Sequence, residues 1–415
     1  MASASRPVVI IGAGLAGLAC AAELTAAQID TLVVEASDEV GGRVRTDQVD
    51  GFLLDRGFQV LLTAYPELGR RVDLAELDLG VFEPGATVLR GSRTDVVADP
   101  FRAPRSLPAT IRSALPGGIA NPGDLLRLWT LRRRLSATPP NVLLRGSDVR
   151  TSESLPIMGF SPKFIRSFLA PFVGGVQLDP ALSTSVRMFD VIMRMLLEGS
   201  VGLPARGMGE IPAAISRTLP DDSIRLNERV LEIRGNQVRT ENGLIDAHRI
   251  VVATEGPTAS ALLDLPQPGS RPVGCLWFDI PAPPVTGRRI ILAGDSTGPV
   301  LNAAVVSEVA PTYAPPGRHL IGLATPGDIG SDLEARALAQ VREWWGDQVD
   351  SWRHLRTDRI AHGQPDQSPP FAPRRRVQIA DHLFVCGDHR DTGSIQGALF
   401  SGRRCALSVI DSLAG

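Results

Sequence analysis

The order of apolar runs along the chain predicts a strand–helix–strand unit at its start. Val8–Ile11 is a run of four apolar residues, as expected of a parallel strand that is covered on both faces. An Ala- and Leu-rich stretch with the composition of a buried helix follows, and a second apolar run occupies residues 31–34. The pattern predicts the first βαβ unit of a parallel sheet and places the turn between them at one edge of that sheet.

That turn carries the spacing Gly12-x-Gly14-x-x-Gly17, with Leu15 and Ala16 between the last two glycines. Gly12 permits the tight turn, Gly14 lets a pyrophosphate approach the backbone, and Gly17 lets the helix pack closely on the strand. The free N–H groups at the helix start favour the diphosphate.

An acid completes this nucleotide-binding pattern at the end of the second strand. Glu35 lies 18 residues after Gly17 and is followed by Ala36. A carboxylate at this distance accepts hydrogen bonds from the ribose hydroxyls of a dinucleotide. Because an acid disfavours a 2′-phosphate, the pattern favours FAD or NAD over NADP.

The rest of the chain alternates between two kinds of sequence. Residues 81–97 read as short strands with turns, and the chain from there to residue 200 is rich in helix signals. Residues 201–262 and 363–415 return to short apolar strands with helices, and residues 263–362 read as antiparallel strands. We expect helices at 63–80 (with a turn), 124–135, 210–218 and 331–345, a helical stretch at 159–200 broken at Gly174-Gly175, and strands at 223–234, 237–239, 249–254, 274–280, 289–292, 301–306, 320–324 and 383–386. The sequence thus predicts a dinucleotide-binding domain made of 1–75, 201–262 and 363–415, and a substrate domain made of 76–200 and 263–362.

Composition narrows the function classes. With 43% hydrophobic and 21% charged residues and a net charge of −2, the chain looks like a globular protein with no electrostatic case for nucleic acid. The four cysteines are scattered and the six histidines lack ligand spacing, so we expect neither disulfides nor a metal, and a reducing cytoplasm is the expected location. No apolar run is long enough to span a bilayer.

The continuation Glu39-Val-Gly-Gly-Arg43 and the stretch Gly51–Val60 resemble the superfamily of flavin amine oxidases, phytoene desaturases and protoporphyrinogen oxidases. Residues 55–68 (DRGFQVLLTAYPEL) are most similar to a plant and bacterial subgroup of FAD-dependent oxidoreductases. The resemblance implies an α/β fold: a Rossmann-type FAD domain with an interleaved α+β substrate domain that contains an antiparallel sheet. It also implies FAD as the cofactor.

The same resemblance assigns further residues to the cofactor. Gly42 and Arg43 would add to the pyrophosphate site, the loop Gly57-Phe58-Gln59-Val60 would pass the isoalloxazine ring, and Val230 would meet the adenine through its backbone. Thr254 ends a strand next to the nucleotide, and Gly387-Asp388 would face the pyrophosphate and ribityl chain. A helix that opens at Ser394-Ile395-Gln396 would direct its N-terminus at the flavin. The resulting set of cofactor-binding residues is Gly12, Gly14, Leu15, Ala16, Gly17, Glu35, Ala36, Gly42, Arg43, Gly57, Phe58, Gln59, Val60, Val230, Thr254, Gly387, Asp388, Ser394, Ile395 and Gln396.

The chain departs from the amine oxidases of this superfamily in one respect. Those enzymes carry a lysine in the substrate-domain sheet, whereas the single lysine of this chain, Lys163, lies in a predicted helix. No cysteine between Cys275 and Cys386 could anchor the flavin, so we expect non-covalent FAD. The departure points to hydride removal from a C–H bond of an apolar substrate, as in desaturases. The alternatives are a lysine-less amine oxidase, a redox-neutral isomerase, and a flavin-binding protein without activity.

The catalytic residues are not determined by these patterns, and three candidates stand out. Gln59 lies in the expected flavin loop, and His389 follows the Gly387-Asp388 pair. Trp277 and Phe278 are neighbours on a predicted strand, so their side chains point to opposite faces. Either one of them faces the flavin and the other the core, or both belong to the core. Asp279 would share the face of Trp277 and is the nearest acid that could hold an amine.

One helix suggests contact with a membrane. In residues 124–135, Leu125, Leu128, Trp129 and Leu135 are expected near one face, with Arg127, Arg132, Arg133 and Arg134 around it. Such a helix can lie on an anionic membrane. A helix packed on its own domain with a solvated basic face is the alternative.

Overall fold

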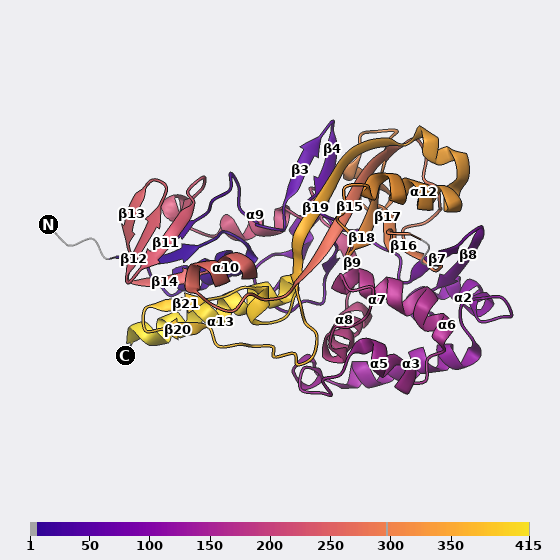
Figure 1. Cartoon of the computed structure of the whole chain (residues 1–415), viewed down its shortest axis with the longest axis horizontal. Coiled ribbons are helices and arrows are strands. Elements are labelled where there is room, and N and C mark those ends of the chain that lie inside the picture. The colour runs from indigo at the N-terminus through magenta and orange to yellow at the C-terminus, as the bar shows by residue number, and fades with distance from the viewer. Residues whose placement is uncertain (1–5, 296–297, 415) are drawn as a thin grey trace.

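The computed structural model describes residues 6–295 and 298–414. A parallel sheet forms the core of the part on the left of Figure 1, in the strand order β10-β2-β1-β14-β21-β20. The first five strands are parallel, and β20 pairs antiparallel with β21. Their bounds are β1 Val8–Ile11, β2 Thr31–Val34, β10 Ile224–Arg225, β14 Arg249–Val252, β20 Gln378–Ala380 and β21 Leu383–Val385. Three separated chain segments therefore build one sheet, as the sequence predicts.

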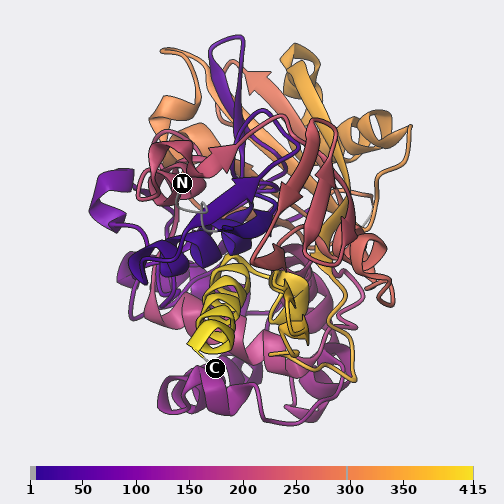
Figure 2. The same cartoon turned by 90° about the vertical axis from the view of Figure 1, so that its left-hand side faces the viewer.

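Helices cover one face of this sheet and a small antiparallel sheet covers the other. Helix α1 (Leu15–Ala26) lies beside the long C-terminal helix α13 (Ile395–Ala414), as Figure 2 shows. A Cβ on Gly402 of α13 would lie 2.1 Å from the carbonyl oxygen of Ala16, so a glycine is needed for this close approach. On the other face, β11 (Val230–Arg234), β12 (Gln237–Thr240) and β13 (Gly243–Asp246) form a meander whose Val238 packs against β1 and β2.

A seven-stranded sheet forms the second part of the molecule, in the order β19-β15-β18-β17-β16-β7-β8. All its pairs are antiparallel except β7 with β16. Leu276 and Phe278 face helix α12 (Leu333–Trp345), while Cys275 and Trp277 face the main core shared with the part that contains the parallel sheet. The bounds are β7 Ala86–Arg90, β8 Arg93–Val97, β15 Ser270–Ile280, β16 Ile290–Ala293, β17 Asn302–Val305, β18 His319–Pro326 and β19 Arg353–Pro365.

Short strands tie the two parts together, and helices complete the second one. The pair β3–β4 and the small sheet β5-β9-β6 combine segments before residue 82 with segment 201–203. Their bounds are β3 Thr46–Val49, β4 Phe52–Asp55, β5 Leu61–Leu62, β6 Gly80–Val81 and β9 Val201–Leu203, and the remaining α-helices are α2 Leu107–Ser113, α3 Pro122–Ala137, α4 Pro140–Leu143, α5 Thr151–Ile157, α6 Pro162–Phe164, α7 Ala170–Gln177, α8 Val186–Glu198, α9 Glu210–Ser216, α10 Gly256–Leu263 and α11 Val306–Val309.

Three local predictions were wrong. Residues 63–80 form turns and one short 3-10 helix (Leu74–Leu77) instead of an α-helix. Gly174 and Gly175 do not break a helix but lie inside α7, where a Cβ on Gly175 would be 1.7 Å from the Asn302 side chain; the glycines permit close packing. The expected strand 223–234 is two strands, since β10 joins the parallel sheet and β11 starts the meander.

The sequence also missed β19, the longest strand. Its edge position leaves most of its residues half-buried or exposed, so the apolar signal of a buried strand is lacking. Because β19 pairs with β15 as far as Pro365, it crosses the expected boundary at residue 363. The domain boundaries themselves stay a prediction.

Candidate functional site

The glycine turn between β1 and α1 leaves a space that fits a diphosphate. Gly12 has φ +105°, which only glycine adopts readily, and a Cβ on Gly17 would lie 2.0 Å from the Gly12 oxygen. At Gly14, by contrast, a Cβ would meet no protein atom within 4 Å. Gly14 immediately precedes α1, and no side chain caps this helix. The N-terminus of α1 with Leu15 and Ala16 therefore faces open space and can receive an anion.

Glu35 is held at the end of β2 by backbone donors. Its carboxylate accepts hydrogen bonds from the amides of Ala13 (2.7 Å) and Ser37 (2.9 Å), and its backbone oxygen accepts one from Glu228 (2.9 Å). The last contact brings the start of β11, Val230, to the side of Glu35 and Ala36. Each carboxylate oxygen has a second lone pair, so Glu35 can still accept from ribose hydroxyls.

An ion pair connects the first and last chain segments of the part that contains the parallel sheet. A terminal nitrogen of Arg43 lies 2.8 Å from Asp388, and the other donates to the backbone oxygen of Gly363 at 2.8 Å. Burial alone would raise the pKa of Asp388, but the charge and hydrogen bond of Arg43 lower it below its usual range. Gly42 (φ +61°) lies so close to Gly14 that its Cβ would be 3.4 Å from the Gly14 Cα. Gly42, Arg43 and Asp388 therefore lie beside the glycine turn, as predicted.

The expected flavin loop links this ion pair to the substrate sheet. The Gln59 amide donates to the backbone oxygens of Arg43 (2.7 Å) and Arg56 (2.9 Å), and the Gly57 amide donates to Asp358 of β19 at 3.2 Å. Phe58 and Val60 are half-buried against the main core. The Gln59 side chain therefore holds the backbone of the loop in place, and its amide nitrogen is occupied by these two hydrogen bonds.

The strand ends beside Gly387 place two histidines at the site. His389 is buried, and within the described part of the chain neither of its ring nitrogens has a hydrogen-bond partner. Burial lowers its pKa to about 4, so it is neutral at pH 7. Its ring lies against Gly387, where a Cβ would be 2.5 Å from the imidazole. His362 of β19 is also buried, and burial followed by the charge of Arg43 lowers its pKa. No sequence pattern indicated His362, because β19 was not expected.

The start of α13 completes the group of expected cofactor-binding residues around the glycine turn and the Arg43–Asp388 pair, which we call the cradle. Ser394 caps the helix, since its hydroxyl accepts from the Gly397 amide at 3.0 Å. Gln396 is turned aside, with its side-chain oxygen accepting from the Glu67 amide at 2.9 Å, and Ile395 packs against the main core. Thr254 follows β14, with its backbone nitrogen 3.3 Å from where a Cβ on Gly12 would lie.

The candidate residues on β15 are buried and in contact with other parts of the protein. Trp277 faces the main core and donates from Nε1 to Asp358 at 3.2 Å, and Phe278 lies on the α12 side. Asp279 is buried and accepts from Arg318 (2.7 Å) and Arg353 (3.1 Å). The acid nearest to the expected substrate wall is therefore neutralised by two arginines.

Asp55 is a buried acid that the sequence analysis did not identify as a candidate. Asp55 accepts hydrogen bonds from Thr46 (2.6 Å), the Met208 amide (3.0 Å) and Tyr313 (2.9 Å). Burial raises its pKa to about 6. Tyr313 and Met208 are far away in the sequence, which is why no local pattern indicates the contact.

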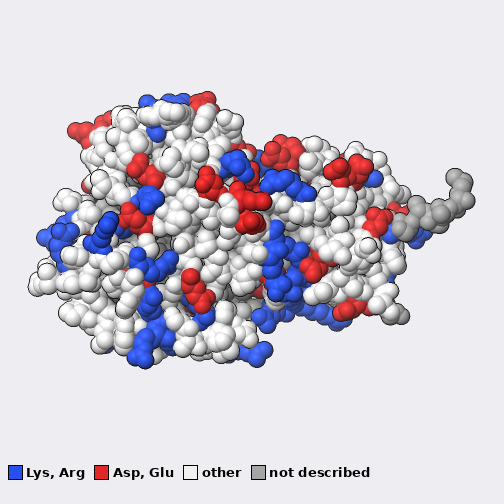
Figure 3. All heavy atoms as spheres, turned by 180° about the vertical axis from the view of Figure 1, so that it is seen from behind, with Lys and Arg blue, Asp and Glu red and all other residues white. Residues whose placement is uncertain are grey.

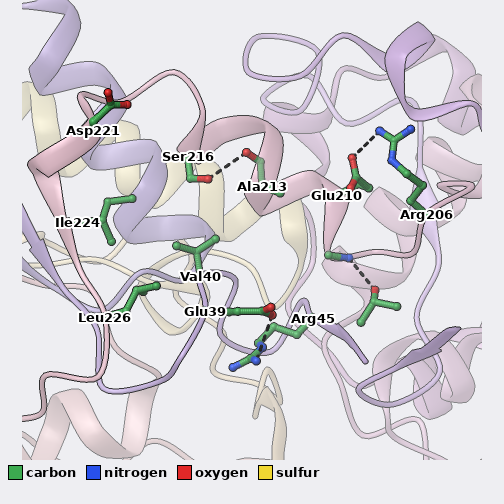
Figure 4. A pocket seen from close by; sticks show the side chains of 12 residues that line it. Glu39, Val40, Arg45, Arg206, Glu210, Ala213, Ser216, Asp221, Ile224 and Leu226 are labelled. Atoms are coloured by element: carbon green, nitrogen blue, oxygen red, sulfur yellow. Dashed lines mark hydrogen bonds and ion pairs between the residues drawn. The ribbon is translucent and has the colours of Figure 1, made fainter. Parts of the chain in front are cut away.

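A surface pocket of about 540 Å³ lies between residues 39–46 and α9 (Figure 4). The ion pairs Arg206–Glu210 (2.6 Å) and Arg45–Glu39 (3.2 Å) flank it. None of the expected cofactor-binding residues lines it, so it is separate from the cradle. Among residues 6–295 and 298–414, no group of three or more His, Cys, Asp or Glu could hold a metal ion.

The model of the flavin containing amine oxidoreductase family matches residues 15–410. The chain belongs to this family. Among curated relatives, it is 23% identical over 98% of its length to hydroxysqualene dehydroxylase of Rhodopseudomonas palustris, whose length is covered to 99%. It is 25% identical to protoporphyrinogen oxidase 2 of Arabidopsis thaliana (45% of the chain, 35% of the relative) and 26% identical to probable polyamine oxidase 4 of the same plant (60% and 48%). The chain thus spans about a third to a half of these last two relatives.

Solved structures share the fold. An oxidoreductase from Methanosarcina mazei superimposes with a TM-score of 0.73 at 17% identity, covering 98% of this chain and 100% of that one. A putative protoporphyrinogen oxidase from Exiguobacterium sp. 255-15 gives 0.72 at 15% identity, covering 99% and 100%. The family match places the chain among the flavin-containing oxidoreductases, which agrees with the expected flavin cofactor.

The residues of the cradle fit FAD. The open space at Gly14 and the α1 N-terminus suit its pyrophosphate, and Glu35 suits the ribose. Buried polar atoms without a described partner, in His389 and His362, gather near the Arg43–Asp388 pair, where the polar part of a cofactor would satisfy them. The individual binding roles stay predictions.

Proposed function

We propose that this enzyme removes a hydride from a C–H bond of an apolar substrate, in the manner of a desaturase or dehydrogenase. FAD supplies the hydride acceptor and is reoxidised by oxygen or another acceptor. The residues of the chain hold FAD without a covalent link, position the substrate and exclude water. The observation that carries the proposal is the state of the acids around the substrate sheet: each is already committed to a partner within the protein.

An amine substrate would need a free carboxylate in a buried site. Asp279 has two arginine partners, and Asp358 binds Trp277 and Arg356. Asp55 is surrounded by hydroxyl and amide donors. Burying an ammonium without a free acid costs several kcal/mol, whereas an apolar chain gains roughly 25 cal/mol for each Å² removed from water. The balance favours an apolar substrate.

Two further observations support this reading. Lys163, the single lysine, lies on α6 in the helical part instead of the substrate sheet. The relative that is matched over nearly its full length is named hydroxysqualene dehydroxylase, and another is the zeta-carotene-forming phytoene desaturase of Myxococcus xanthus, at 25% identity over 62% of the chain and 55% of that protein. Both names refer to long hydrocarbon chains.

Non-covalent binding is supported by where the cysteines lie. All four are buried, and Cys20, Cys386 and Cys405 belong to the main core between α1, β21 and α13. Cys386 directly follows β21 and is buried, so it is part of the packing instead of a free anchor for the ring.

Anaerobic stopped-flow absorbance tests the substrate class. Flavin bleaching is compared for phytoene in detergent micelles and for putrescine, with dithionite as the control that the flavin can be reduced. We expect phytoene to bleach the flavin faster than putrescine does. Faster bleaching by putrescine would restore the amine oxidase alternative, and no bleaching by phytoene while dithionite reduces the flavin would also contradict the proposal.

A further inference from the structure

Exposed apolar side chains are concentrated on one part of the surface. Of the 12 large hydrophobic residues that are exposed in the described chain, eight lie within residues 101–157, the helical lobe. The other four are spread over residues 226–407. These eight residues are Phe101, Leu107, Ile111, Leu115, Leu126, Trp129, Val142 and Ile157. Their concentration in one lobe makes the surface of that lobe a candidate contact site.

Helix α3 has one face buried in the lobe and one face exposed to solvent. Its inner face buries Leu131 and Leu135 in the core of the lobe. Leu126 and Trp129 are 60% and 44% exposed and lie with Arg133 on the opposite face. The expectation that Trp129 shares a face with Leu135 was therefore wrong, because six residues at about 100° each place them roughly 120° apart. The outer face of α3 (Leu126, Trp129, Arg133) is apolar and basic with nothing described packed over it.

Neighbouring residues extend this outer face. The ring of Phe101, which is 65% exposed, lies 4.9 Å from the guanidinium of Arg132 on α3. The guanidinium of Arg133 lies 4.9 Å from the ring of Trp129. An arginine stacked on an exposed aromatic ring places its positive charge beside an apolar surface. A lipid bilayer offers the matching pair of partners, with headgroup phosphates next to acyl chains.

The charge of the lobe is opposite to that of the chain. Residues 101–157 contain nine arginines and three acids, a net charge of +6, whereas the whole chain carries −2. Arg132 and Arg134 are paired with Asp99 and Asp190. Within the described residues, five exposed arginines of the lobe form no ion pair: Arg105, Arg112, Arg133, Arg145 and Arg150. Seen from behind, basic groups outnumber acidic ones over the lower left, where the helical lobe lies (Figure 3).

We propose that the helical lobe docks on the surface of an anionic lipid bilayer. Leu126, Trp129 and Phe101 would enter the boundary of the acyl chains, and the unpaired arginines would meet the headgroup phosphates. No helix in residues 6–295 and 298–414 is long and apolar enough to cross a membrane, so the contact is with the surface. A nucleic acid would use the charge but not the apolar side chains, which is why lipid is the better match. The inference goes beyond the proposed function and does not depend on it.

Vesicle sedimentation of the full-length holoprotein tests the surface. Vesicles of phosphatidylcholine mixed with phosphatidylglycerol are compared with pure phosphatidylcholine vesicles, at low and high salt. We expect binding to the anionic vesicles alone, weakened by salt. The double variant L126D/W129D should lose sedimentation, and R133E should bind about tenfold more weakly.

Two matched controls carry the same changes elsewhere. L244D alters an exposed leucine on β13, and R359E alters an exposed arginine on β19. Both should bind as the unmodified protein does, and all variants should keep their FAD content and unfolding temperature. Equal sedimentation of L126D/W129D and the unmodified protein, or no binding to anionic vesicles, would overturn the proposal. Light scattering in the absence of lipid that shows a dimer dissociated by L126D/W129D would overturn it in favour of a second copy of the chain.

Discussion

Replacing Gly14 with valine separates cofactor binding from folding. The backbone of Gly14 is extended, at φ −71° and ψ 174°, a conformation that valine adopts readily. Its Cβ would meet no protein atom within 4 Å. The apoprotein should therefore fold normally, with an unfolding free energy within about 0.5 kcal/mol of the unmodified apoprotein.

The effect on FAD should be large, because the added side chain would occupy the space in front of the α1 N-terminus. Hydrogen bonds to a charged group contribute about 1.5–3 kcal/mol each, so losing two of them costs roughly 3–6 kcal/mol. That loss corresponds to an increase of about 10²–10⁴-fold in the dissociation constant. Titration of apoprotein with FAD, followed by flavin fluorescence, measures it directly.

Gly17→Val is the matched control. There the new Cβ would lie 2.0 Å from the Gly12 oxygen, so this variant should lose stability even without cofactor. Thermal unfolding of the two apoproteins should rank Gly17→Val well below Gly14→Val. Unchanged FAD stoichiometry in Gly14→Val, or a loss of apoprotein stability equal to that of Gly17→Val, would refute the assignment of this turn to the pyrophosphate.

Three further predictions concern the cradle and the core. Boiling or acid precipitation should release intact FAD into the supernatant, since no cysteine anchors it; flavin that stays with the pellet would contradict this. Arg43→Ala should destabilise the apoprotein by about 3 kcal/mol in urea unfolding, because it leaves Asp388 buried without its partner. Arg70→Ala is the control: the Arg70 side chain is exposed and lies 3.8 Å from Glu67, which keeps its partner Arg403, so this change should cost less than about 1 kcal/mol. Burial raises the pKa of Asp55 to about 6 from 3.8, so its stabilising contribution is present below about pH 4 and is lost as pH rises through 6. Asp55→Asn, which mimics the protonated acid, should gain stability over the unmodified protein by up to about 3 kcal/mol across this range. Parallel profiles of stability against pH for the two proteins would disprove the shift.

The parts of the site that the sequence predicted are those set by local geometry. The spacing of Gly12, Gly14 and Gly17 has one steric solution, and Glu35 follows from the length of one βα unit. Arg43 and Asp388 were both expected at the pyrophosphate because their motifs resemble family segments; the ion pair between them is a finding of the structure.

The parts that the sequence missed depend on contacts between distant segments. Strand β19 carries few apolar residues because it lies at a sheet edge, so His362 and Asp358 were hidden with it. Gln396 accepts a hydrogen bond from the amide of Glu67, and Asp279 is neutralised by Arg318 and Arg353. The partners are far apart in the sequence, so no local pattern could predict these contacts. Glycine positions were ambiguous for a related reason: Gly174-Gly175 permits packing against β17, which looks the same in sequence as a helix break.

The central claim is that the substrate loses a hydride from a C–H bond to the flavin. Mass spectrometry of the product from an anaerobic single turnover tests it most directly, with phytoene as substrate in micelles and flavin absorbance recorded in the same sample. The account predicts a product with two hydrogens fewer than the substrate and flavin reduced in equal amount. A product of unchanged mass with oxidised flavin would show that the enzyme is an isomerase and would contradict the account.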